Sequence, residues 1–159
     1  MKLTVLLSLL ANLASAAVFS ATTFNDISIA GGTAGNAKAE ALAALDGLPT
    51  DLTTVEKADI DFLDEVNGVA NDAEVGAFNP AIEAASGEEA DALQRGKIKN
   101  KVLKLTATVL GLEAQQAQGE DVADKLAEEQ TKLDKNIAED EAEAGNASTA
   151  VPFDGEIAA

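Results

Sequence analysis

The chain has 159 residues, of which 28 are acidic and 11 are basic, so its formal net charge at neutral pH is -17. It contains no histidine, cysteine, tryptophan or tyrosine, which excludes an imidazole base, a thiol nucleophile, disulfides and a metal site built from His or Cys. Because most of so acidic a surface repels phosphate, we expect no nucleic-acid partner, and no motif in the chain predicts a cofactor.

The N-terminus is typical of a secretory signal peptide. One lysine precedes an apolar run, Leu3–Leu13, that is too short to span a membrane, and small residues follow at positions 14–16. We therefore predict a signal peptide over residues 1–16, with cleavage after Ala16 or Ala17. No later run resembles a transmembrane segment or a lipid-anchor signal, so we expect the mature protein to be secreted and released, or at most held non-covalently at a surface.

Residues 17–35 are predicted to form an extended arm that ends in a glycine-rich hinge. Phe24–Ile29 combines aromatic and β-branched residues and is expected to form one short strand. Gly31, Gly32 and Gly35 follow, but their spacing matches neither the dinucleotide-binding nor the P-loop pattern, and no further strand–helix units come after them. We therefore interpret the glycines as a flexible hinge and not as a nucleotide site.

Residues 36–145 are predicted to form an antiparallel bundle of about four helices, because apolar residues recur there three and four positions apart. The expected helices cover about residues 36–46, 53–77, 86–119 and 122–144. The remaining residues, 146–159, are mostly small or polar and are predicted to be a loose, flexible tail. The expected fold class is therefore all-α.

Three local signals suggest where the helices begin and break. Thr53-x-x-Glu56 and Ser86-x-x-Glu89 are capping-box patterns, in which a side chain and the backbone satisfy each other's free donors at a helix start. Pro80 cannot continue the hydrogen-bond ladder of a helix, so we expect it to interrupt the second helix and to start a short new turn.

Four carboxylates gather in the predicted second helix, at Asp59, Asp61, Asp64 and Glu65. They lack the alternating ligands and the glycine of a calcium loop, so we interpret them as a solvated helix face, with weak binding of divalent cations as the alternative. Carboxylate chemistry on sugars would need an apolar pocket and usually aromatic platforms, and the chain has only five aromatic residues. We therefore predict a protein without catalytic residues.

The third predicted helix holds the strongest functional signal. Five of the eleven basic residues fall within ten positions there, namely Arg95, Lys97, Lys99, Lys101 and Lys104. Because the apolar stripe of this helix turns inward, we expect them to form a charged outer face. We favour a structural role, in which they neutralise acidic segments such as residues 138–144. The alternative is a docking patch for an anionic phospholipid, an acidic polysaccharide of the cell wall or a partner protein.

The predicted tail begins with a possible modification site. Asn146-Ala147-Ser148 matches the N-glycosylation sequon and lies just after the last predicted helix. In a secreted eukaryotic protein Asn146 would be a credible acceptor, because glycosylated residues lie on the surface.

Two long segments and the acidic last helix resemble a group of small, cysteine-free secreted proteins of filamentous ascomycete fungi. The segments are TFNDISIAGGTAGNAKAEA and FLDEVNGVANDAEVGAFNPAIEAASGEEADALQRGKIKNKVLKL, and the resemblance covers about Thr23–Ala144. It implies an extracellular or wall-associated protein from a group mostly without an assigned activity, some of whose members are treated as candidate effectors in plant or insect interactions. It supplies no catalytic residues.

Two functions are consistent with these observations. The first is a non-enzymatic secreted fungal protein that acts, like an effector, by binding at the cell wall or to a host component. The alternative is an amphipathic protein that binds hydrophobic surfaces or lipids after its alanine-rich bundle opens. The expected partner is therefore a protein, a polysaccharide or a lipid surface.

Overall fold

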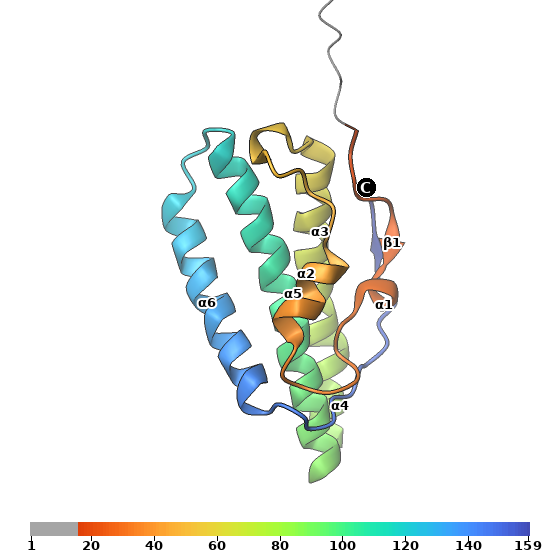
Figure 1. Ribbon diagram of the computed structural model, residues 1–159. Coiled ribbons are helices and arrows are strands. Elements are labelled where there is room, and N and C mark those ends of the chain that lie inside the picture. Colours follow the sequence, from red (N-terminus) through yellow and green to blue (C-terminus); the bar gives the residue numbers. More distant parts are fainter. Residues whose placement is uncertain (1–15) are drawn as a thin grey trace, which may run out of the picture.

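The structure is a computed structural model that describes residues 16–159, and its long helices run antiparallel to one another (Figure 1). The elements in chain order are β1 (Thr22–Thr23), α1 (Phe24–Ile27), α2 (Ala37–Ala44), the 3₁₀ turn η1 (Leu52–Thr54), α3 (Lys57–Ala73), the π-helical turn η2 (Glu74–Phe78), α4 (Asn79–Ala84), α5 (Glu88–Ala117), α6 (Ala123–Ala142) and β2 (Glu156–Ile157). The predicted all-α bundle is confirmed. The predicted signal peptide, apart from its last residue, lies outside the described residues.

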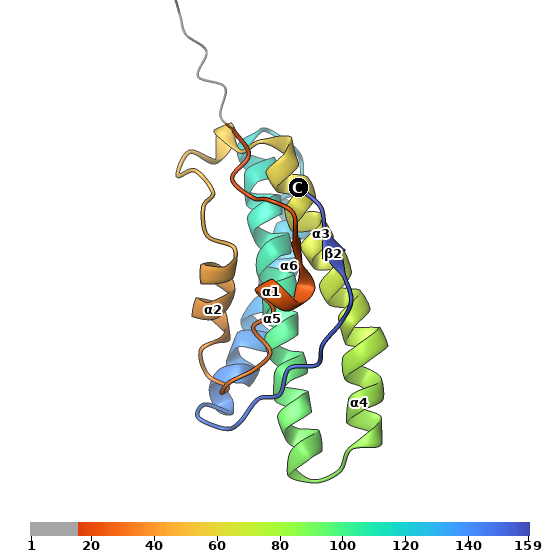
Figure 2. The same ribbon diagram turned by 90° about the vertical axis from the view of Figure 1, so that its right-hand side faces the viewer.

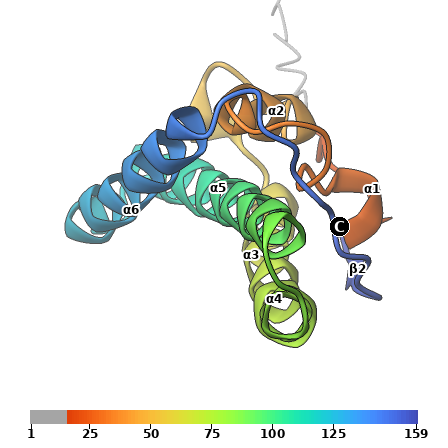
Figure 3. The same ribbon diagram turned by 90° about the horizontal axis from the view of Figure 1, so that it is seen from below.

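The long helix α5 is the centre of the bundle. It packs between α3 and α6 and also contacts α2, as the view along the helices shows (Figure 3). Val102, Leu103 and Leu105 are all buried although they point to different sides of the helix, because each side meets another element. Two alanines of α2, Ala37 and Ala41, are fully buried and allow a close approach of that short helix. In the described part of the chain, no helix is both long and apolar enough to cross a membrane.

The second predicted helix continues through Pro80 and does not break there. The π-helical turn η2 joins α3 to α4, and the backbone N–H of Asn79 bonds to the carbonyl of Glu74, five residues back. Pro80, which has no N–H to donate, follows directly within the first turn of α4. Because the π-helical turn changes the hydrogen-bond pattern just before Pro80, the helix continues through the proline.

Both predicted capping boxes are wrong. Asp51, not Thr53, supplies the capping oxygen in the first region, and it caps the 3₁₀ turn η1, while α3 begins later without a side-chain cap. At the second, Gly87 is the N-cap of α5 with φ of 58°, and the Ser86 side chain makes no capping bond. A positive φ at the N-cap costs glycine little but strains a residue with a side chain, so glycine and not serine occupies the N-cap of α5.

The C-terminal tail is not loose, and the N-terminal arm is not simply extended. The two run side by side along the bundle (Figure 2), and β1 pairs with β2 in antiparallel register, with Thr22 opposite Ile157. Phe24 begins a helical turn, α1, where a strand was expected, and it is fully buried, as is Ile157. Ile157 belongs to the main core, and Val151 and Phe153 pack against the cluster that contains Phe24, so apolar contacts hold the tail to the bundle.

Candidate functional site

The basic stretch of α5 divides into two groups that face opposite sides of the helix. Arg95 and Lys99, four residues apart, point toward the N-terminal arm and the C-terminal tail. Lys97, Lys101 and Lys104 point toward the junction of α3 and η2. The five residues are therefore not one outer face, and each group needs its own interpretation.

Lys99 is a structural residue. Its side chain is fully buried, and its ammonium group donates to the carbonyls of Gly31 at 2.7 Å and Thr33 at 3.1 Å and pairs with Glu40 at 2.7 Å. All three partners satisfy the donors of one ammonium group, which is what a buried charge requires. The glycine segment that was predicted to be a flexible hinge is thus held to α5 by this lysine.

Arg95 is the only member of the basic stretch that forms an ion pair with residues 138–144 in the described chain. Its guanidinium lies 3.0 Å from Glu143, just past the end of α6, and 2.8 Å from Glu88, and it also donates to the carbonyl of Ala147. Hydrogen bonds to Glu88 and, second, to Glu143 raise the pKa of Arg95. The hydrogen bond from Arg95 and, second, the one from Asn146 lower the pKa of Glu143. The favoured structural interpretation therefore describes Arg95 and Lys99 well.

The lowered pKa of Glu143 leads to a prediction about acid stability. A carboxylate with a depressed folded-state pKa stabilises the fold above its ordinary value of 4.5, and this contribution disappears as the pH falls through the folded pKa. We expect the free energy of unfolding of the native chain to fall more steeply below about pH 4.5 than that of Glu143→Gln. Glu141→Gln, which removes the same charge at an exposed residue, is the control, and equal acid slopes in all three proteins would contradict the assignment.

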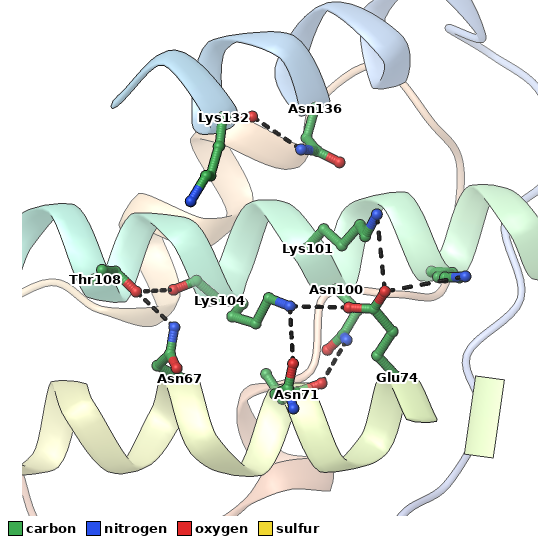
Figure 4. Close-up of polar contacts among 11 residues, drawn as sticks. Asn67, Asn71, Glu74, Asn100, Lys101, Lys104, Thr108, Lys132 and Asn136 are labelled. Atoms are coloured by element: carbon green, nitrogen blue, oxygen red, sulfur yellow. Dashed lines mark hydrogen bonds and ion pairs between the residues drawn. The ribbon is translucent and has the colours of Figure 1, made fainter. Parts of the chain in front are cut away.

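Three lysines of the second group converge on one carboxylate. The ammonium groups of Lys97, Lys101 and Lys104 lie 4.0, 3.7 and 2.9 Å from the carboxylate oxygens of Glu74. The close-up shows Lys101 and Lys104 pointing toward this carboxylate (Figure 4). Lys104 also donates to Asn71 at 3.3 Å. A single carboxylate cannot neutralise three ammonium groups, so this side of α5 keeps an excess of positive charge.

The same region opens into a cleft that α6 completes. We call it the lysine cleft. Its volume is about 380 Å³, and its lining residues are Glu74, Lys101, Lys104, Leu105, Lys132, Lys135 and Asn136. The lining holds four lysines and one carboxylate, although the whole chain carries -17, and three further carboxylates, Glu128, Glu129 and Glu139, pair with the two lysines of α6.

The two lysines of α6 are more exposed than those of α5. Lys132 pairs with Glu128 at 2.7 Å and Glu129 at 3.0 Å, and these hydrogen bonds raise the pKa of its ammonium group. Lys135 lies 3.9 Å from Glu139, and its side chain is 76 % exposed. Exposed pairs of this kind exchange readily with solvent and with ligands, because each contributes only about 0.2–1 kcal/mol. The α6 lysines are therefore available to an anionic ligand.

The lining of the lysine cleft is suited to binding. Lysine ammonium groups are compact point charges on flexible stems, so they recognise anionic groups that are spread along a ligand better than they orient one planar group. Among residues 16–159, no group of three acidic, His or Cys side chains could hold a metal ion. The arrangement supports electrostatic recognition of a polyanion.

Sequence reasoning found half of the lysine cleft. It singled out Lys101 and Lys104 but not Lys132, Lys135 or the central Glu74. The charged residues of α6 look like an ordinary solvated helix, and nothing in their spacing shows that two of them face α5. The only feature of the sequence that could have revealed them is that lysines flank the apolar stripe of α6.

The other sequence-predicted sites lie apart from the lysine cleft. Asp59 is buried and does not belong to a solvated face, whereas Asp61 is exposed and pairs with Lys57. The Asn146 side chain is exposed and donates to Glu143, while the Ser148 hydroxyl is buried against the carbonyl of Ala30, so Asn146 stays a candidate acceptor on the surface.

Comparisons with known proteins identify the family of the chain but no activity. No curated protein and no solved structure matches it. A family model described as "Domain of unknown function (DUF8454)" matches residues 19–152, which include every helix of the bundle and all five residues of the basic stretch. The chain therefore belongs to the DUF8454 family.

Proposed function

We propose that this protein is exported and acts without catalysis, by binding an acidic polysaccharide of the cell wall or of a host surface in the lysine cleft. The observation that carries the proposal is the convergence of four lysines from two helices on one cleft of a strongly acidic chain. An acidic surface repels polyanions, so their binding is favoured at a cleft lined by lysines. Export is supported by the signal-peptide pattern of the N-terminus.

The contacts between Glu74 and the three lysines of α5, of which Lys101 and Lys104 line the cleft, support this function over a purely structural one. Glu74 needs only one ammonium partner, and Lys104 at 2.9 Å supplies it. Lys97 and Lys101 are held at 4.0 and 3.7 Å, which leaves part of their hydrogen-bonding capacity unused. A carboxylated or phosphorylated ligand would provide the missing acceptors.

Replacing three cleft lysines is expected to weaken polyanion binding. The triple variant Lys101→Gln, Lys132→Gln and Lys135→Gln should reduce the affinity for polygalacturonate about tenfold or more at low salt, since each exposed contact contributes on the order of 0.2–1 kcal/mol. The measurement is titration calorimetry, with circular dichroism to show that the fold is retained.

The matched control removes the same charge elsewhere. Lys38, Lys57 and Lys125 are exposed lysines outside the lysine cleft, and their triple replacement by glutamine makes the same change in net charge. We expect this variant to bind nearly as well as the native protein. Equal losses in both triple variants would show that only net charge matters, and no binding by the native protein would reject the proposed ligand.

A hydrophobic-surface or lipid-binding function is the second candidate, and one observation favours it. Of the twenty residues of α6, only Leu133 and Asp140 are buried, while Leu126 and Ile137 are partly covered. A helix with so small a share of the core could leave the bundle and apply its apolar side to lipid. This candidate predicts that the native protein and the cleft triple variant float equally with neutral phosphatidylcholine vesicles. If the native protein does not float with such vesicles, the candidate is rejected.

A further inference from the structure

Asp59 is a buried carboxylate with an unusual set of partners. It lies in the first turn of α3 and is 1 % exposed. One of its oxygens accepts from the backbone nitrogen of Val18 at 2.8 Å and from that of Phe19 at 3.0 Å. Within residues 16–159, no lysine or arginine side chain forms an ion pair with it, so its negative charge has no positive partner among the side chains of the fold.

A buried carboxylate without a cation is costly to the fold. Removal of a charge from water costs several kcal/mol, and neutral amide donors offset less of that cost than a charged donor does. Val18 and Phe19 are separated from Asp59 by about forty positions in the chain, so their arrival at this carboxylate depends on the tertiary fold. A free α-amino group at Val18 would supply the missing charge at an atom that is already in place.

Two further contacts hold this nitrogen in position. The ring of Phe19 stacks on that of Phe62, with centroids 4.6 Å apart and an interplanar angle of 13°. Phe62 is buried and lies one helical turn after Asp59, so the same face of α3 holds both the ring and the backbone of the arm. The Phe19 side chain also packs against the main hydrophobic core.

We propose that the bond between Ala17 and Val18 is the processing site of this chain and that Asp59 binds the new N-terminus. A peptidase and one water molecule hydrolyse the bond, which leaves a carboxylate on Ala17 and an amine on Val18 that takes up a proton. An α-amino group is normally protonated at neutral pH, so an ammonium–carboxylate pair replaces a neutral hydrogen bond. The small residues allow cleavage after Ala16 or after Ala17. Only cleavage after Ala17 places the ammonium group on the Val18 nitrogen, which contacts Asp59. This inference rests on the proposed export.

The first experiment tests the pairing without any need for export. Chains that begin at Val18, with either a free or an acetylated amine, are compared by denaturant unfolding at neutral pH. Acetylation removes the charge, and we expect it to raise the unfolding equilibrium constant about tenfold or more, the difference between a charge-assisted and a neutral hydrogen bond. The matched control is the same comparison in chains that begin at Ala17, where we expect less than about a twofold change because the ammonium group lies in solvent.

Asp59→Asn should abolish the effect of acetylation in the chain that begins at Val18. If this variant does not fold, the comparison of the Val18 and Ala17 starts decides the question alone. Equal effects of acetylation at both starts, or no effect at either, would overturn the pairing.

N-terminal sequencing of the protein from the culture medium tests the cleavage. A start at Val18 is the expected result, and a start at Ala17 overturns the processing site. Retention of the whole chain inside the cell would instead reject the proposed export, and the affinity for polygalacturonate remains an independent measurement of the lysine cleft.

Discussion

Replacement of Gly96 by alanine is expected to destabilise the protein by about 3 kcal/mol, at the upper end of overpacking effects. Gly96 lies on α5 where the arm and the tail cross the helix. A Cβ at this position would lie 2.0 Å from the carbonyl oxygen of Thr149 and 3.2 Å from that of Ala30. Both contacts are with backbone, and Thr149 is held by a hydrogen bond to Ala92 of the same helix. The tail would therefore have to leave the bundle surface.

The sign of this prediction makes it informative. Alanine is the better helix former by about 1 kcal/mol, so helix propensity alone would predict a gain in stability. Gly68→Ala in α3 is the matched control, because nothing lies within 4 Å of its added Cβ, and we expect it to stabilise the fold. Denaturant unfolding measures both variants. A Gly96→Ala protein as stable as the native chain would show that the tail does not cross α5 as described.

Replacement of Lys99 by methionine is expected to cost about 1–3 kcal/mol, the range for leaving hydrogen-bond acceptors without their donor. Methionine keeps the apolar stem but leaves the carbonyls of Gly31 and Thr33 without their donor and Glu40 without its cation. The arm should loosen first, so its amide hydrogens should exchange faster than those of α3. Equilibrium unfolding and hydrogen exchange measure the two effects.

Lys101→Met is the matched control for Lys99. It lies two residues further along the same helix, but its side chain is 36 % exposed and its ion pair with Glu74 is long, at 3.7 Å. We expect it to change the free energy of unfolding by less than about 1 kcal/mol, as for other exposed pairs. Similar effects at both positions would contradict the division of the basic stretch into a structural group and a ligand-accessible group.

These two sites explain why the arm after residue 16 and the C-terminal tail are part of the domain. Lys99 holds the glycine segment of the arm, Arg95 holds the tail at Ala147, and Gly96 between them lets the tail lie against the helix. The arm and the tail in turn contact each other, for example through the bond between the Ala34 N–H and the Asn146 carbonyl. The segment that looked like a basic outer face is, in its first half, the anchor for both ends of the chain.

Local sequence rules failed at several helix starts and at one proline, and at the start of α2 a distant residue supplies the acceptor. Asp140 of α6 accepts from the backbone N–H groups of Gly35 and Ala37 and so serves the start of α2 from another helix. The Asn79-Pro80 step does not end its helix, because the π-helical turn before it changes the hydrogen-bond ladder. Capping boxes and proline breaks are local rules, and tertiary packing can override either one.

The sequence by itself determined the all-α class, the approximate helices of the bundle and the absence of His and Cys chemistry. Helical periodicity and composition are properties of neighbouring residues, so they can be read without the fold. Only the tertiary structure decided that Lys99 is buried while Lys101 borders a cleft, that α6 adds Lys132 and Lys135 to it, and that Val18 meets Asp59. Burial and charge pairing depend on which helix faces lie against each other, and that is set by contacts between residues tens of positions apart.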